Sequence, residues 1–223
     1  MKFDFAYMAE AFWDLLRYVP ITVAMAIVSM AFAVVIAVLI ALVQRNKTPG
    51  LLQLATVYLS FFRGTPVLVQ LFIIYFGLPQ LFPELNSMGA LTAVIMGLSL
   101  NTSAYLAEIF RAALDSVERG QLEAAYTVGM TSIQALRRII LPQAARNAVP
   151  GMGNIFIGLL KSTSLAFTLG VTELLAEGKM LTASTLKFFE VYIDVAIIYW
   201  LLTIFYSWLQ SRLENKLGKP YNL

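Results

Sequence analysis

The chain has 223 residues, of which 59% are apolar and only 13% are charged. Soluble domains are about 45–50% apolar and about 25% charged, so this composition excludes a water-soluble enzyme with a polar surface. The absence of cysteine and histidine also excludes disulfides, thiol nucleophiles, Cys/His metal sites and Ser–His triads. The formal net charge is only +3, which gives no reason to expect a nucleic-acid partner. We therefore expect a membrane protein that is not an enzyme and has no metal site.

The first long apolar run predicts a transmembrane helix over residues 19–43. The run contains no charged residue, and a helix of that length spans about 37 Å, enough to cross a hydrocarbon core of about 30 Å. A cleaved signal peptide is the alternative, but its apolar region would be shorter and its flank purely basic. Residues 1–18 mix both signs of charge and are predicted to form an extracytoplasmic N-terminal segment.

Residues 51–82 form a second apolar stretch that is too long for one straight span. An Arg-Gly-Thr-Pro sequence interrupts it at residues 63–66. Because proline lacks a backbone donor and clashes with the preceding turn, we expect the helix to break there. Residues 66–82 would then do most of the crossing, and residues 51–62 would form a helix on the cytoplasmic side.

Three more apolar stretches bring the predicted number of spans to five: residues 88–114, 149–171 and 188–209. The third span is polar at its middle, around Asn101, and the fourth contains Lys161. An intramembrane charge costs about 2.5–3.5 kcal/mol on insertion scales and usually faces the bundle interior or an aqueous path. Residues 19–213 are therefore predicted to be an all-α integral membrane domain, followed by a tail at 214–223.

The positions of lysine and arginine predict the orientation in the membrane, because these residues accumulate in cytoplasmic loops. Ten of the sixteen lie on one side: Arg45, Lys47, Arg111, Arg119, Arg137, Arg138, Arg146, Arg212, Lys216 and Lys219. Four lie on the other side: Lys2, Arg17, Lys179 and Lys187. With five spans, this distribution places the N-terminus outside and the C-terminus in the cytoplasm.

The one long polar loop, residues 115–148, lies on the cytoplasmic side in this topology. It is predicted to form two short helices, at residues 121–128 and 133–141, the second of which ends at Pro142. Gly129 can end the first helix in the left-handed conformation, and Thr131 or Ser132 can cap the second. Taken alone, the pattern also fits a plain loop with two solvated helices.

A set of spaced residues in this loop resembles the EAA loop of the membrane subunits of ATP-binding-cassette (ABC) importers. Every position of that signature is occupied: Glu123, Ala124, Ala125, Gly129, Ile139, Leu141 and Pro142. The resemblance implies that residues 123–129 form a coupling helix that enters a cleft of a separate ATPase subunit. The small side chains and the turn at the glycine fit that role. Closure of two ATPases would then move two such helices together.

Further stretches resemble the polar amino-acid uptake permeases within that family. They are Phe-Phe-Arg-Gly-Thr-Pro at 61–66, Leu-Val-Gln-Leu-Phe at 68–72, Tyr-Leu-Ala-Glu-Ile-Phe-Arg-Ala at 105–112 and Gly-Gln at 120–121 before the EAA residues. The sequences at 163–167 and 57–60 are most like the cystine-type permeases of Gram-positive bacteria. One departure is visible, because relatives commonly have an aspartate after the lysine of the fourth span and this chain has Ser162.

The resemblance implies a type I ABC importer permease fold in a bacterial plasma membrane. The implied partners are two ABC ATPase subunits, a second permease copy or paralogue, an extracytoplasmic substrate-binding protein and the lipid bilayer. The chain has no nucleotide-binding motif, so it carries no cofactor, and ATP and Mg²⁺ would bind to the ATPase. The expected substrate is a polar amino acid, with L-cystine as the first choice.

The expected substrate path consists of polar residues in the predicted spans. The candidates are Lys161, Thr163, Ser164, Asn101, Gln70, Tyr75 and Glu108, with Arg63 and Pro66 as gate or structural residues. Each also has a structural interpretation: local hydrogen bonds to helix carbonyls, cross-helix hydrogen bonds, or an i,i+3 pair of Glu108 with Arg111. For Lys161 that interpretation is a contact to Glu108 or to carbonyls of a neighbouring helix.

Two other classes of function compete with the importer. An ion-coupled secondary transporter would need a chain of intramembrane carboxylates or matching broken repeats. Only Glu108 and Asp194 lie near the membrane, both toward its edges, and no repeat is visible. A membrane anchor or assembly protein without transport activity is the third possibility.

Overall fold

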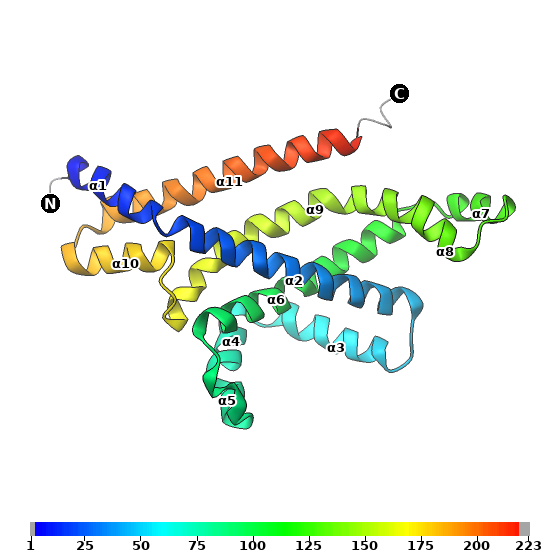
Figure 1. Cartoon of the computed structure of the whole chain (residues 1–223), viewed down its shortest axis with the longest axis horizontal. Coiled ribbons are helices and arrows are strands. Elements are labelled where there is room, and N and C mark those ends of the chain that lie inside the picture. Colours follow the sequence, from blue (N-terminus) through cyan, green and yellow to red (C-terminus); the bar gives the residue numbers. More distant parts are fainter. Residues whose placement is uncertain (1–2, 219–223) are drawn as a thin grey trace.

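The computed structural model describes residues 3–218 and consists, over that range, of helices connected by short turns (Figure 1). Lys2, Lys219 and the tail from residue 219 onward lie outside the described residues. The helices are α1 (Phe5–Leu16), α2 (Val19–Asn46), α3 (Leu51–Gly64), α4 (Val67–Phe72), the π turn η1 (Ile73–Gly77), α5 (Leu78–Leu81), the 3₁₀ turn η2 (Pro83–Ser87), α6 (Ala90–Asp115), α7 (Arg119–Thr127), α8 (Ser132–Ala135), the π turn η3 (Leu136–Ile140), α9 (Leu141–Ser162), the 3₁₀ turn η4 (Thr163–Leu169), α10 (Leu174–Thr185) and α11 (Phe188–Gly218).

Four helical segments within the described residues are long and apolar enough to cross a membrane, and a bent pair makes a fifth. The four are Val19–Asn46, Ala90–Asp115, Ser132–Leu169 and Phe188–Leu217. The fifth is the pair Leu51–Gly64 and Val67–Leu81, whose two halves are bent by 112°. The all-α membrane fold predicted from the sequence is confirmed, and the predicted break lies where α3 ends, before an extended Thr65 and Pro66.

The second apolar stretch is sharply bent at the predicted break, by 112°. The 14 residues of α3 give a helix of about 21 Å, and α3 packs against α2 and α6. The segment after the break, Val67–Leu81, is one helical arm in which the π turn η1 separates α4 from α5. The break therefore divides the apolar stretch into two helical arms.

Helices α2 and α6 lie against each other at the centre of the bundle (Figure 1). Ala33 and Ala37 of α2 are fully buried in one cluster with Ala104 and Ala107 of α6. Between membrane helices there is little hydrophobic driving force, so close backbone approach through small residues supplies the packing energy. Helices α3, α4 and α9 each pack against one or both members of this pair.

The polar loop is shorter than the sequence predicts, because its second helix does not end at Pro142. Residues from Ser132 to Leu169 form one continuous helical segment. Pro142 lies in the first turn of α9, directly after the π turn η3. Proline has no N–H to donate to the preceding turn, and the wider backbone of the π turn accommodates its ring there. The expectation that proline terminates the helix was therefore wrong, and residues 141–148 belong to the long helix.

Two helices that the spans did not predict, α1 and α10, pack against α11 at the end of the bundle opposite α7 (Figure 1). Lys187 Nζ lies 2.6 Å from Asp4 Oδ2, and the Asp4 N–H donates to Glu190 Oε1 at 3.1 Å. The hydrogen bond from Lys187 lowers the pKa of Asp4 below its ordinary value. These contacts fasten the N-terminal segment to the start of α11.

Replacing Ala37 with leucine should destabilise the bundle, because the side chain is fully buried between α2 and α6. We expect Ala37→Leu to lower the free energy of unfolding by about 1–3 kcal/mol, the usual range for overpacking. The matched control is Val35→Leu on the same helix, where the side chain is 60% exposed and the change should stay within about 0.5 kcal/mol. Equal effects of the two variants in an SDS unfolding titration would contradict this account of the packing.

Candidate functional site

The break between α3 and α4 is held together by two side-chain amides. Gln70 Nε2 lies 3.1 Å from the carbonyl oxygens of both Phe62 and Thr65, and 2.8 Å from Thr65 Oγ1. Asn101 Nδ2 donates to the Phe62 carbonyl at 3.0 Å and to Gln70 Oε1 at 3.0 Å. The end of a helix leaves carbonyls without partners, and Pro66 has no N–H to offer them. The two amides supply the missing donors within the membrane domain.

This arrangement separates the roles of two residues that the sequence placed together in the substrate path. Gln70 is 1% exposed, and its amide hydrogen bonds all lie at the break. Asn101 is partly exposed and also lines a cavity between α6 and α9. Asn101 therefore contacts both the broken helix and the cavity, whereas Gln70 contacts the broken helix and does not line the cavity.

The cavity between α6 and α9 has a volume of about 210 Å³ and a mixed lining. Its polar residues are Asn101, Thr102, Tyr105, Asn154 and Ser162. Sequence reasoning did not select Asn154, although its spacing of four and eight residues from Gly158 and Ser162 places all three on one face of a helix. The Asn154 side chain is exposed and makes no hydrogen bond within residues 3–218, so it can offer both its donor and its acceptor to a ligand.

The other candidates in the fourth span lie apart from this cavity or bond locally. Lys161 is exposed, precedes Ser162 in the last turn of α9, and forms no ion pair within the described range. Its predicted structural contact to Glu108 is not formed. Thr163 donates to the Leu160 carbonyl at 2.7 Å and Ser164 to the Lys161 carbonyl at 2.8 Å, which is the local bonding considered as their alternative role.

Tyr75 also lies away from the cavity. Its side chain packs against the apolar core formed by α2, α4, α6 and α9, and its ring centroid lies 4.8 Å from that of Phe76. The structure thus gives Tyr75 a packing role, and the cavity receives Asn101 alone from the predicted path residues.

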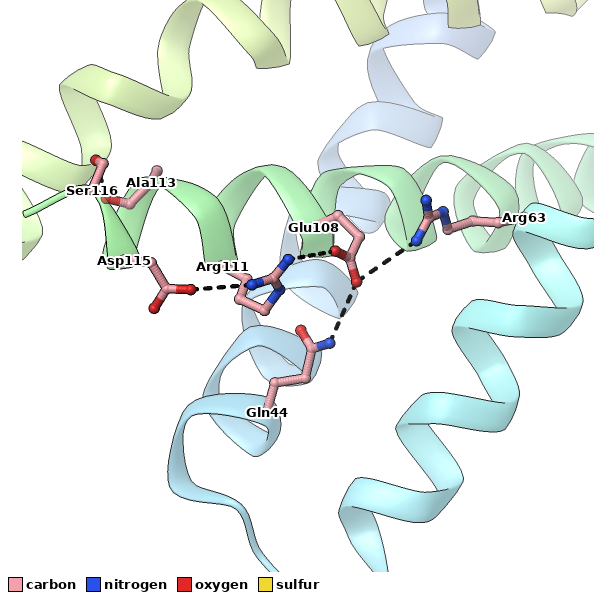
Figure 2. A network of polar contacts seen from close by, with 7 residues as sticks. All are labelled: Gln44, Arg63, Glu108, Arg111, Ala113, Asp115 and Ser116. Atoms are coloured by element: carbon pink, nitrogen blue, oxygen red, sulfur yellow. Dashed lines mark hydrogen bonds and ion pairs between the residues drawn. The ribbon is translucent and has the colours of Figure 1, made fainter.

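Figure 2 shows Glu108 at the centre of a polar network that joins α2, α3 and α6. Its carboxylate lies 3.0 Å from Arg111 Nη2 and 3.7 Å from Arg63 Nη1, and Gln44 Nε2 donates to it at 3.5 Å. Arg111 also pairs with Asp115 at 3.1 Å. The predicted Glu108–Arg111 pair is therefore formed, but as part of a larger set of contacts that includes Arg63.

The network reaches the cavity through Tyr105. The Arg63 guanidinium lies 6.0 Å from the centroid of the Tyr105 ring. Tyr105 lines the cavity beside Asn101 and also lines the groove that contains Arg63 and Glu108. A series of contacts therefore runs from Asp115, at the start of the polar loop, through Glu108 to the wall of the cavity.

The polar loop presents a short helix at the far end of the molecule (Figure 1). In α7, Glu123 and Ala124 are exposed and Ala125 is buried, so one face points outward and the other is held against the protein. Gly129 has a φ of +80°, the left-handed conformation predicted for it, and Thr131 and Gln134 form a reciprocal capping box. Of the remaining loop positions singled out by sequence, Ile139 is half-buried, and Leu141 and Pro142 are exposed at the start of α9.

Comparisons with known proteins agree with this architecture. A family model described as the binding-protein-dependent transport system inner membrane component matches residues 33–219. The probable amino-acid permease protein YxeN of Bacillus subtilis is 61% identical over 98% of this chain and 97% of its own length. The L-cystine transport system permease protein TcyL of the same organism is 39% identical over 97% of this chain and 92% of its own length. A crystal structure of an amino acid ABC transporter with histidines has a TM-score of 0.88 and 34% identity, covering 97% of this chain and all of that one.

The role of Gln70 at the helix break can be tested by removing its amide while keeping its length. We expect Gln70→Met to lower the free energy of unfolding by about 1–3 kcal/mol, because buried carbonyl groups at the break lose their donor. Gln80→Met is the control, since Gln80 is exposed and bonds only to the carbonyl of Phe76 on its own turn. A Gln70→Met protein as stable as the Gln80→Met protein would show that the break does not need this amide.

Proposed function

This chain belongs to the family of binding-protein-dependent transport system inner membrane components, and from that membership we propose that it is the translocation subunit of an ABC importer for a polar amino acid. The observation that carries the proposal is the exposed helix α7, which presents Glu123 and Ala124 at the end of the bundle. Members of this family are permease subunits and not enzymes, so the energy for transport would come from a partner.

In the proposed assembly, α7 docks in a cleft of an ABC ATPase subunit that binds ATP and Mg²⁺. Two ATPases, a second permease copy or paralogue and an extracytoplasmic substrate-binding protein complete the importer in a bacterial plasma membrane. The N-terminus lies outside and the C-terminus in the cytoplasm in this arrangement. Support for the orientation comes from the concentration of lysine and arginine near α7 and the end of α11.

Movement of α7 would reach the cavity through the network around Glu108. Asp115 at the end of α6 is paired with Arg111, which is paired with Glu108. Glu108 in turn contacts Arg63 at the end of α3, next to the break whose geometry Asn101 holds. A shift of the loop relative to the bundle would therefore change the position of α3 and the shape of the cavity together.

The cavity between α6 and α9 is the proposed place of contact with the substrate. Its uncharged amides and hydroxyls suit the polar ends of an amino acid, and Lys161, one residue from the lining residue Ser162, carries the charge that would attract a carboxylate. Glu108 is already engaged by two arginines, which favours a gating or structural role for it. L-cystine remains the first choice of substrate, supported by the likeness to TcyL.

An uptake assay tests the function and the substrate separately. The complex with its ATPase and binding protein is placed in liposomes with ATP inside, and labelled cystine, glutamine and arginine are offered one at a time. We expect ATP-dependent accumulation of cystine that ionophores do not abolish. Accumulation of glutamine or arginine instead would show that cystine is not the substrate but would still support an ABC importer for a polar amino acid. Uptake that collapses with the ion gradient and ignores ATP would instead support the ion-coupled alternative, which the comparisons do not favour.

Gly129 provides a test of the coupling role of α7. Gly129→Asp places a charged side chain at the turn behind the helix, where the backbone φ of +80° favours glycine. We expect the variant to reach the membrane at normal levels but to lose most uptake while ATP hydrolysis continues. The control is Gly120→Asp in the first turn of α7, where the added Cβ meets open space and a carboxylate is favoured by the helix dipole. Uptake that falls equally in both variants would count against the role of the turn.

A further inference from the structure

Two cavities of opposite character meet at the α7 end of the bundle. One is an apolar groove of about 380 Å³ between α2, α6 and α9, lined by side chains such as Val38, Phe110 and Met152. The other, of about 530 Å³, lies where α2 and α6 end and α7 begins. Ala41 and Leu114 line both, so the two cavities are direct neighbours, and the pair is called the amphipathic channel.

The second cavity carries an excess of positive charge. Its cationic residues are Arg45, Lys47, Arg111 and Arg119, and its acidic residues are Asp115 and Glu118. Arg111 is occupied by Asp115 and Glu108. The other three cations form no ion pair within residues 3–218 and face a single unpaired carboxylate, that of Glu118. The pocket is therefore suited to an anion.

The first turn of α7 reinforces this preference. Glu118, at the N-cap of α7, makes no capping hydrogen bond with its side chain. The N–H groups of that turn are therefore free of a side-chain acceptor at the N-cap, next to Arg119, which lines the pocket. Backbone N–H groups at a helix N-terminus favour negatively charged ligands.

The depth of the channel matches one leaflet of a bilayer. Along α2 the lining extends from Val34 in the groove to Arg45 in the pocket, which is about 16 Å of helix. Half of a hydrocarbon core of about 30 Å is nearly the same length. An acyl chain lying in the groove would thus place its headgroup phosphate among the basic residues.

We propose that this channel binds one anionic phospholipid of the cytoplasmic leaflet. Its acyl chain lies in the apolar groove, and its phosphate is held by Arg45, Lys47 and Arg119. Basic pockets between transmembrane helices at the cytoplasmic surface are suited to such headgroups. Because Arg119 is the first residue of α7, the bound lipid contacts the helix proposed to dock on the ATPase. Lipid binding is measured without transport, so its test is independent of the substrate and of coupling.

The test uses the complex with its ATPase, loaded with equal amounts of phosphatidylglycerol and phosphatidylcholine and analysed by native mass spectrometry. We expect retention of phosphatidylglycerol over phosphatidylcholine by about tenfold or more, given the strength of attraction of each basic residue. The preference should fall to near parity in the triple variant Arg45→Gln, Lys47→Gln, Arg119→Gln. It should persist in the matched control Arg137→Gln, Arg138→Gln, Lys216→Gln, which removes the same charge outside both cavities. Equal loss in the two triple variants would overturn the site.

A second variant tests the groove without changing charge. Ala145 is exposed and lines the groove, so Ala145→Leu should reduce retention of phosphatidylglycerol, whereas Ala31→Leu at an exposed position outside it should not. Inorganic phosphate is then added as a competitor for the bound phosphatidylglycerol. If it displaces the lipid as readily from the wild type as from Ala145→Leu, the pocket binds free phosphate and the lipid proposal is overturned.

A second copy of the chain is the remaining occupant to exclude. The chain has no cysteine, so Ala145→Cys introduces a unique thiol in the groove. We expect this thiol to react with a membrane-soluble maleimide and to give no disulfide-linked permease dimer on oxidation. Efficient cross-linking between two copies would show that another permease covers the groove and would overturn the proposal.

Discussion

The close contact between α2 and α6 is the constraint on which the rest of the molecule depends. Burial of Ala33 and Ala37 against Ala104 and Ala107 fixes the rotation of α6 about its own axis. Asn101, Tyr105 and Glu108 lie along a neighbouring face of α6, spaced by four and three residues, so that contact also determines where they point. The cavity, the helix break and the ion-pair network are therefore all positioned by alanines that do not themselves line the cavity.

A second constraint is that the interior of a bilayer offers no hydrogen-bond partners to the backbone. Inside a bilayer every backbone polar group needs a partner from the protein, so a broken helix persists only if side chains replace the lost hydrogen bonds. Gln70 and Asn101 do this at the α3–α4 break. Because Asn101 also lines the cavity, the hydrogen bonds that stabilise the break and the surface available to a ligand share one side chain. A ligand bound to the Asn101 amide would compete with, or shift, the hydrogen bonds that Asn101 donates at the break.

Local chemistry explains which features were predictable from the sequence. Long apolar runs, the break before Pro66 and the left-handed conformation of Gly129 follow from neighbouring residues alone, and the structure contains all three. The prediction at Pro142 was wrong because proline is common both in the first turn of a helix and just after the end of one. Only the π turn before Pro142 lets the helix continue through it. The 112° bend depends on how helices meet, which no local pattern encodes. The spacing of Asn154 places it on one helix face with Gly158 and Ser162, but only the packing of α9 against α6 shows that this face lines a cavity.

The two polar clusters differ in a way that fits movement at one and rigidity at the other. The amides at the break are held by short hydrogen bonds around the buried Gln70 side chain, so disturbing them exposes unsatisfied groups to an apolar environment. The Glu108 side chain is 28% exposed, and such ion pairs contribute about 0–1 kcal/mol each. Glu108 can therefore exchange one arginine for the other, or for water, at small energetic cost. The α3–α4 corner would then move as one rigid body, while its link to α6 and to the loop changes partners.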